Sequence, residues 1–187
     1  MKNHLIALYL KFLKEGQVML YPTDTIWGLG CSAVSEEAIR KVFMLKRRSL
    51  EKSMIILVNN IEMIQEYTRF NLAPIKERIL EMETPTTFII PQVFNLSPSL
   101  IKEDGTIAFR IPKHEFCIEL LNQLSAPIIS TSANISGGAT SRTLQEINIE
   151  IKKGVDFIVD DSFDTSNFHT PSTIIKFDEA YKEIKIR

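Results

Sequence analysis

Residues 54–58 form a run of five apolar residues without a polar one. Continuous apolar runs of this length are typical of strands that are covered on both faces of a sheet. Apolar residues at helical spacing lie before it, from Leu5 to Leu13 and again at Ile39, Val42 and Phe43. A buried strand among amphipathic helices favours an α/β domain with a mixed sheet.

Local signals predict the other elements of the chain. Gly16 ends the first helix, and Ser35 caps a second helix that begins with Glu36 and Glu37. Residues 178–180 join two closely spaced strands into a hairpin, so part of the sheet should be antiparallel. We expect strands at 17–21, 54–58, 86–90, 106–110, 127–130, 157–160, 172–177 and 181–187, further helices at 61–67, 74–82 and 114–124, and a loop at 22–32.

The 187 residues contain no repeat, low-complexity tract or linker-like stretch. We therefore expect a single domain over residues 1–187, without an extra C-terminal domain. The longest apolar run is far too short to span a membrane, and residues 1–16 indicate an amphipathic helix without a signal-peptide cleavage site. Two distant cysteines and three scattered histidines offer no zinc spacing. These features predict a cytoplasmic protein that binds no membrane and has no metal ligands of its own.

The charge balance disfavours a dedicated binder of duplex nucleic acid. Lysine and arginine number 22, aspartate and glutamate number 23, and the net charge is −1. Duplex binders usually carry a strong basic excess, although a local basic patch remains compatible with this balance.

Two loops place polar groups where α/β sheets bind ligands. The segment 21–30 follows a buried strand, but its Gly28-Leu29-Gly30 is only a weak dinucleotide fingerprint because it lies away from the strand end. The segment 130–138 contains four hydroxyls, one amide and two glycines. It is either a simple turn or a loop that presents N–H groups and hydroxyls to phosphate.

Cations gather in Lys46-Arg47-Arg48 and Lys52, where a helix ends. They form either a solvated helix end or a clamp for phosphate or carboxylate. Arg110 ends an apolar strand, where an arginine usually reaches solvent or pairs with an acid.

The order of these motifs resembles the YrdC/TsaC family of L-threonylcarbamoyladenylate synthases. Tyr-Pro-Thr-Asp and Gly-Leu-Gly at 21–30 are followed by Lys46-x-Arg48, by Thr-x-Ala-x-Arg at 106–110, by Ser-Thr-Ser-Ala-Asn-x-Ser-Gly at 130–137, and by Pro-Ser-Thr at 171–173. The resemblance runs from about residue 5 to residue 187. It implies a single YrdC-like domain, with a twisted mixed sheet and an open electropositive cavity.

The resemblance also implies a reaction and its site. Such enzymes convert L-threonine, bicarbonate or CO2, and ATP into threonylcarbamoyl-AMP and pyrophosphate, for threonylcarbamoyladenosine modification of tRNA. Mg2+ arrives with ATP. The implied catalytic residues are Lys46, which we expect nearest the transferred group, and Arg48, Ser132 and Asn134. ATP would contact Arg48, Lys52, Thr106, Ser132, Asn134, Thr140 and Arg187, and threonine would contact Thr23, Arg110, Ser130 and Ser172.

The sequence departs from the family pattern at several positions. Asp24 replaces the commoner Glu, Ser49 replaces the usual Pro, and Leu57 stands where longer members carry a threonine-contacting His. No side chain stands out as a general base. Catalysis would therefore rest on holding the reactants in line and on stabilising charge.

The main alternative is a non-catalytic module of the same fold that binds double-stranded RNA or tRNA. A carbamoyl-transfer maturation enzyme and a riboflavin-pathway synthase are less compatible, because the additional segments of the first and the acidic metal motifs of the second are missing. For the synthase we expect transient contact with the proteins that transfer threonylcarbamoyl to tRNA, at most weak RNA binding, and a monomer or homodimer.

Overall fold

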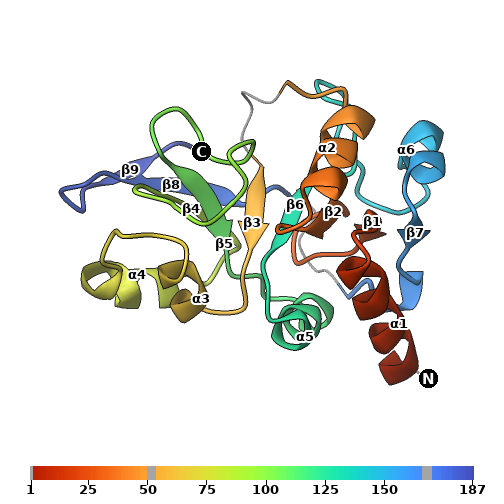
Figure 1. The fold of residues 1–187 in the computed structure, drawn as a ribbon, viewed down its shortest axis with the longest axis horizontal. Coiled ribbons are helices and arrows are strands. Elements are labelled where there is room, and N and C mark those ends of the chain that lie inside the picture. Colours follow the sequence, from red (N-terminus) through yellow and green to blue (C-terminus); the bar gives the residue numbers. More distant parts are fainter. Residues whose placement is uncertain (1, 50–53, 166–169) are drawn as a thin grey trace.

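The computed structural model describes residues 2–49, 54–165 and 170–187. A nine-stranded sheet runs through these residues in the order β7-β1-β2-β6-β3-β5-β4-β8-β9 (Figure 1). The strands are β1 (Met19–Tyr21), β2 (Gly28–Ser32), β3 (Ile55–Leu57), β4 (Thr86–Ile90), β5 (Ile107–Arg110), β6 (Ile128–Ser132), β7 (Phe157–Ile158), β8 (Thr173–Phe177) and β9 (Glu183–Lys185).

Helices flank the sheet on both faces. They are α1 (Lys2–Lys14), α2 (Glu36–Leu45), α3 (Ile61–Gln65), α4 (Lys76–Leu80), α5 (Glu115–Leu124) and α6 (Ile149–Gly154), with short 3-10 turns η1 (Ala73–Ile75) and η2 (Asp161–Phe163). None of the helices in the described residues is long and apolar enough to cross a membrane.

The sheet is mixed, as the sequence predicts. β1 with β7, β3 with β5, and β4 with β8 are parallel pairs, whereas the other neighbours are antiparallel. The β8–β9 pair is the expected hairpin.

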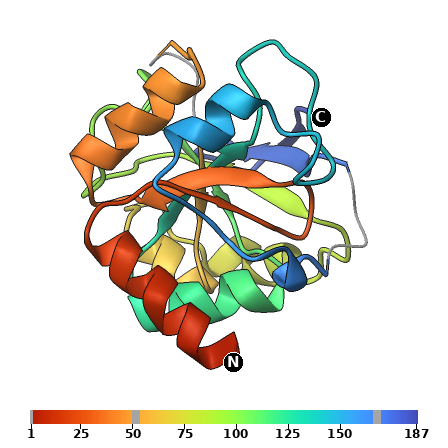
Figure 2. The same ribbon diagram turned by 90° about the vertical axis from the view of Figure 1, so that its right-hand side faces the viewer.

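Two apolar clusters cover opposite faces of the sheet. The first contains buried residues of α2, α3 and α4 together with Ile56 of β3 and Ile107 and Phe109 of β5. The second contains residues of α1 and α5, which contact each other (Figure 2), together with Leu57 of β3 and Ile128 of β6. Because side chains alternate along a strand, neighbouring residues such as Ile56 and Leu57 belong to different clusters.

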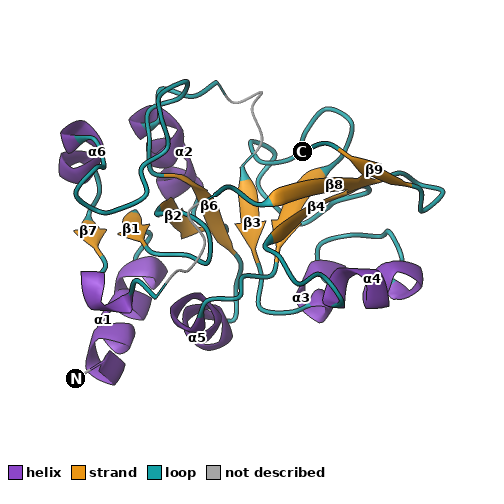
Figure 3. Ribbon diagram, turned by 180° about the vertical axis from the view of Figure 1, so that it is seen from behind, coloured by secondary structure: helices purple, strands orange, loops and turns teal. Residues whose placement is uncertain are grey.

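Helices α1 and α5 cover only part of their face of the sheet. In Figure 3 no helix is drawn over β3, β4 or β8. On β5, Ala108 and Arg110 alternate with the core residues Ile107 and Phe109 and therefore point to this uncovered area. This area holds the pocket described below.

The expected elements are present, with shifts at their ends, but the prediction of a loop over 22–32 is wrong for its second half. Residues 28–32 form β2, which pairs antiparallel with both β1 and β6. Gly28 and Gly30 suggested a loop, yet in the sheet they permit close packing. A Cβ at Gly30 would lie 1.9 Å from the carbonyl oxygen of Ile129 on β6. Helix α6 was not predicted from the sequence.

We predict that Gly30→Ala strongly destabilises the fold, because the added methyl group meets the backbone of β6. The free energy of unfolding should fall by at least about 2 kcal/mol in urea denaturation. The matched control is Gly154→Ala, whose Cβ would meet only the end of the Leu45 side chain. Since that side chain can turn away, this variant should change stability by less than about 1 kcal/mol. Equal losses in the two variants would contradict the proposed close packing of β2 on β6.

Candidate functional site

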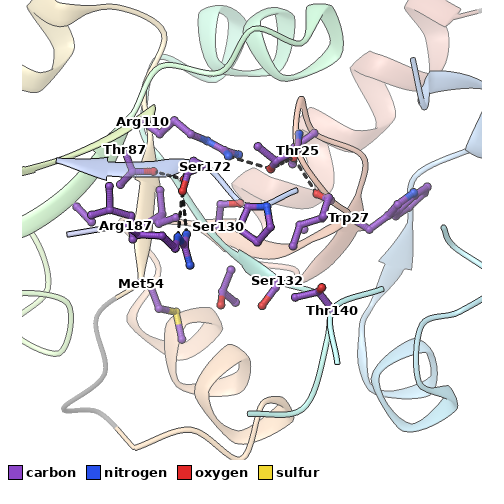
Figure 4. Close-up of a pocket in the computed structure, with 18 of the residues that line it drawn as sticks. Thr25, Trp27, Met54, Thr87, Arg110, Ser130, Ser132, Thr140, Ser172 and Arg187 are labelled. Carbon is purple, nitrogen blue, oxygen red and sulfur yellow. Dashed lines mark hydrogen bonds between the residues drawn. The ribbon is translucent and has the colours of Figure 1, made fainter. Parts of the chain in front are cut away.

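A pocket of about 290 Å³ lies on the uncovered part of the sheet. Its floor includes a row of directly paired residues on four neighbouring strands, Ser130, Ile55, Ala108 and Ile89. Figure 4 shows the pocket from close by. The lining comprises Thr23, Thr25, Ile26, Trp27, Gly28, Arg48, Met54, Ile55, Thr87, Ile89, Ala108, Arg110, Ser130, Thr131, Ser132, Thr140, Pro171, Ser172, Ile174 and Arg187.

The pocket lining is cationic. It contains three arginines, Arg48, Arg110 and Arg187, and no carboxylate among the described lining residues. Eight threonine and serine side chains in the described lining, Thr140 among them, add hydroxyl groups that can form hydrogen bonds with a ligand. Arginine forks and hydroxyls together suit ligands with carboxylate or phosphate groups.

Arg110 is fixed at one end of the pocket and is almost fully buried. Its Nη1 donates to Thr25 Oγ1 at 2.9 Å, and its Nη2 lies 3.4 Å from Asp24 Oδ1. The other oxygen of Asp24 accepts the backbone N–H of Lys113 at 3.0 Å. Asp24 therefore offsets part of the arginine charge and orients it, as expected for a buried charge with an acid partner.

The hydroxyls near Arg110 are also held in place. Ser172 and Thr87 hydroxyls lie 2.7 Å apart, and Thr23 Oγ1 donates to the carbonyl of Ile26 at 2.8 Å. The Nε and Nη2 groups of Arg187 donate to the carbonyl oxygen of Ser172, at 3.2 and 3.0 Å (Figure 4). This end of the pocket is thus preorganised by contacts within the protein.

The backbone geometry at the end of α2 explains why one residue separates Lys46 from Arg48. Lys46 is the C-cap residue, and Arg47 adopts the left-handed conformation with φ of 49°. The N–H of Arg48 bonds the carbonyl of Phe43, and that of Arg47 bonds the carbonyl of Met44, which is the Schellman pattern. The chain reverses at Arg47, so Lys46 reaches the loop after β6 while Arg48 lines the pocket.

Lys46 lies beside the pocket and not in its lining. Its Nζ donates to the carbonyl oxygens of Ser132 and Asn134 at 2.5 and 2.7 Å, and to Asn134 Oδ1 at 3.3 Å. Burial, and secondarily the charge of Arg48, lower the pKa of Lys46 to about 7. Burial also lowers the pKa of Arg48.

The structure brings most of the predicted site residues together. Eight of them line the pocket, and Asn134 lies behind Ser132, whose hydroxyl donates to Asn134 Oδ1 at 2.5 Å. Thr106 is outside the lining, and its hydroxyl donates to Asp104. Lys52 lies outside the described residues. The eight predicted residues that line the pocket are Arg48, Ser132, Thr140, Arg187, Thr23, Arg110, Ser130 and Ser172.

Sequence reasoning missed Thr25, Thr87 and Trp27 as pocket residues. Thr87 gave a usable signal, since it is a polar residue directly before the three apolar residues of β4. Leu57, at the position of the family's histidine, is fully buried in the second apolar cluster. Among the described residues there is no group of three or more His, Cys, Asp or Glu side chains that could hold a metal ion.

Comparisons with known proteins identify the family and support the fold. Residues 11–187 match the domain family Sua5_yciO_yrdC, described as telomere recombination. A threonylcarbamoyl-AMP synthase of Psychromonas ingrahamii is 32% identical over 170 residues, covering 88% of both chains. A threonylcarbamoyl-AMP synthase of Hydrogenovibrio crunogenus is 32% identical over 139 residues, covering 72% of this chain and 75% of its own. The structure of P. abyssi Sua5 complexed with L-threonine has a similar fold, with a TM-score of 0.87, 23% identity and coverage of 97% of this chain and 53% of that one.

We predict that Arg47 can be replaced by glycine but not by valine. Glycine adopts a positive φ without strain, and only an exposed ion pair with Glu150 is lost, so Arg47→Gly should change the free energy of unfolding by less than about 1 kcal/mol. Arg47→Val should lose about 1–3 kcal/mol, because a β-branched residue is strained there. Urea denaturation measures both, and Glu150→Gln controls for the ion pair. A glycine variant as unstable as the valine variant would exclude backbone strain as the cause.

Proposed function

The chain belongs to the Sua5_yciO_yrdC family, and we propose that it makes threonylcarbamoyl-AMP and pyrophosphate from L-threonine, bicarbonate or CO2, and ATP. The product would serve the threonylcarbamoyladenosine modification of tRNA. The observation that carries the proposal is one pocket containing two separately held arginines, Arg110 and Arg48. The reaction brings a carboxylate and a triphosphate into one site, and each needs a cationic partner.

The end of the pocket around Arg110 suits the amino acid. The guanidinium would bind the carboxylate of threonine, and the hydroxyls of Thr23, Ser130 and Ser172 would contact its polar groups. All four side chains are buried, and those of Thr23, Ser172 and Arg110 make hydrogen bonds within the protein. Such rigidity favours binding because little conformational freedom is lost.

The end of the pocket around Arg48 suits the nucleotide. Arg48 would offset triphosphate charge, and Mg2+ would be held by the phosphates, with hydroxyls and no carboxylate offered by the described lining. Arg48, Ser132 and Asn134 form the proposed catalytic group, and Lys46 lies beside them, bonded to Ser132 and Asn134. The proposed ATP contacts are Arg48, Lys52, Thr106, Ser132, Asn134, Thr140 and Arg187.

The chemistry needs little beyond positioning. The neutral amine of threonine would add to CO2 and lose a proton, giving a carbamate. A carbamate oxygen would attack the α-phosphorus of ATP, and the bond from that phosphorus to the bridging oxygen would break, releasing pyrophosphate. Proximity and electrostatic stabilisation can supply most of such a rate enhancement.

Surface ion pairs favour the synthase over an RNA-binding module. Arg40, Lys41 and Arg47 on and beside α2 each pair with a carboxylate within 3.3 Å. Paired cations are less available to RNA phosphates. We further propose a cytoplasmic enzyme, monomeric or homodimeric, that meets the tRNA threonylcarbamoyl-transfer proteins transiently.

The proposal is tested by pyrophosphate release. With ATP and Mg2+, release should require both threonine and bicarbonate, and mass spectrometry should detect threonylcarbamoyl-AMP. Arg48→Met should lower kcat/KM for ATP by at least about 100-fold, because a charge-assisted contact to phosphate is lost. Pyrophosphate release by the wild type without threonine, or no release at all, would contradict the proposed activity.

A second prediction separates the two ends of the pocket. Arg110→Met is combined with Asp24→Asn, because removing the arginine alone would leave a buried carboxylate without its partner. The double variant should weaken threonine binding by about 100-fold and ATP binding by less than about 3-fold. Calorimetric titrations measure both, and Asp24→Asn alone is the control. Equal losses for the two ligands would remove the carboxylate assignment.

A further inference from the structure

We infer that Lys46 is a positioning residue, whose ammonium group holds residues 132–138 in the shape that binds ATP and does not itself touch the substrates. This inference deepens the proposed function and rests on it for its kinetic part. It differs from the expectation that Lys46 lies nearest the transferred group.

The donors of Lys46 are already fully used. An ammonium group has three N–H donors and no acceptor. The three acceptors around Nζ are the carbonyl oxygen of Ser132 and both the carbonyl and side-chain oxygens of Asn134. The side chain has no exposed surface. A phosphate oxygen could reach Nζ only if one of these bonds broke.

Lys46 holds the loop from two directions. Its side chain bonds residues 132 and 134, and its own carbonyl oxygen accepts the N–H of Ser136 at 2.9 Å. Within the loop, Asn134 Nδ2 donates to the carbonyl oxygen of Gly138 at 2.6 Å. Asn134 Oδ1 accepts from both Ser132 and Lys46. These bonds form one connected network with Lys46 at its centre.

The network fixes the nucleotide end of the pocket and leaves the other end alone. Ser132, where the loop begins, and Thr140, two residues after its end, line the pocket together with Arg48. Arg110 depends on different partners, Asp24 and Thr25. Loss of the Lys46 contacts should therefore disturb ATP binding and spare threonine binding.

Burying a charged ammonium group costs free energy. A lysine at this position therefore needs a compensating role, and the geometry that it imposes on the loop is such a role. Burial lowers the pKa of Lys46, so the charged form is disfavoured in this position. Charge-assisted hydrogen bonds to three oxygens offset that penalty and also fix the direction of each acceptor. An apolar residue could fill the space, but it would remove one donor from each of the three oxygens.

The first test is hydrogen–deuterium exchange on the protein without ligand. Lys46→Met removes the donors and keeps an unbranched side chain that is one atom shorter, and Arg48→Met is the matched control two positions away. We expect Lys46→Met to raise exchange at Asn134, Ser136 and Gly138 by at least about 10-fold, because their N–H groups bond the carbonyl oxygens of Ser132, Lys46 and Ile135. Arg48→Met should leave these amides unchanged. Unchanged exchange in Lys46→Met would overturn the inference.

The second test separates the kinetic constants. Lys46→Met should raise KM for ATP by at least about 10-fold and change KM for threonine by less than about 3-fold. Lys46→Met combined with Asn134→Ala should lose little more than Lys46→Met alone, because both act through one network. Additive losses, or an equal rise in both KM values, would overturn the positioning role. If Lys46→Met does not fold, Lys46→Gln, which retains two donors, takes its place in both tests.

Two of the measurements test the role of Lys46 independently of the proposed synthase activity. ATP affinity measured by calorimetry and amide exchange need no turnover. A wild-type protein that binds ATP but releases no pyrophosphate would contradict the synthase proposal, while the exchange results would still decide the role of Lys46.

Discussion

An apolar sheet face is stable only when it is shielded from water, and in this protein one face of the sheet is covered only in part. Helices α2, α3 and α4 pack on one face, whereas α1 and α5 leave an area of the other face open over β3, β4 and β8. An open apolar surface would be unfavourable in water. The strands accordingly carry Thr87, Arg110, Ser130 and Ser132 toward that area, in alternation with core residues. The pocket is a consequence of this incomplete cover.

The second determinant is the tight end of α2. The left-handed residue Arg47 directs two adjacent cations to different places, Lys46 into the loop after β6 and Arg48 into the pocket. The close pairing of β2 with β6, which Gly30 permits, holds β6 in place, and the loop begins where β6 ends. Helix, strand and loop thus meet around one buried ammonium group. Their agreement explains how residues far apart in sequence meet at one end of the pocket.

Sequence patterns predicted much of this architecture for identifiable reasons. The apolar run at 54–58 and the cap at Ser35 gave β3 and α2 because burial and capping act locally. β2 could not be recognised, because the need for Gly30 is explained only by the carbonyl of Ile129, on a strand about 100 residues later. The predicted site residues mostly converge, since the motif order resembled a known family. The hydrogen bonds of the buried Lys46 ammonium group to three oxygens are tertiary contacts, which residue spacing in the sequence does not reveal. The same holds for the pairing of Arg110 with Asp24.

The central claim is that one pocket on the open sheet face holds an amino acid at Arg110 and a triphosphate at Arg48. A crystal structure with L-threonine, Mg2+ and a non-hydrolysable ATP analogue tests it most directly. The account predicts the threonine carboxylate at about 3 Å from the Arg110 guanidinium, and phosphate oxygens beside Arg48 and Ser132. Threonine bound elsewhere, or phosphates at the Arg110 end of the pocket, would contradict it.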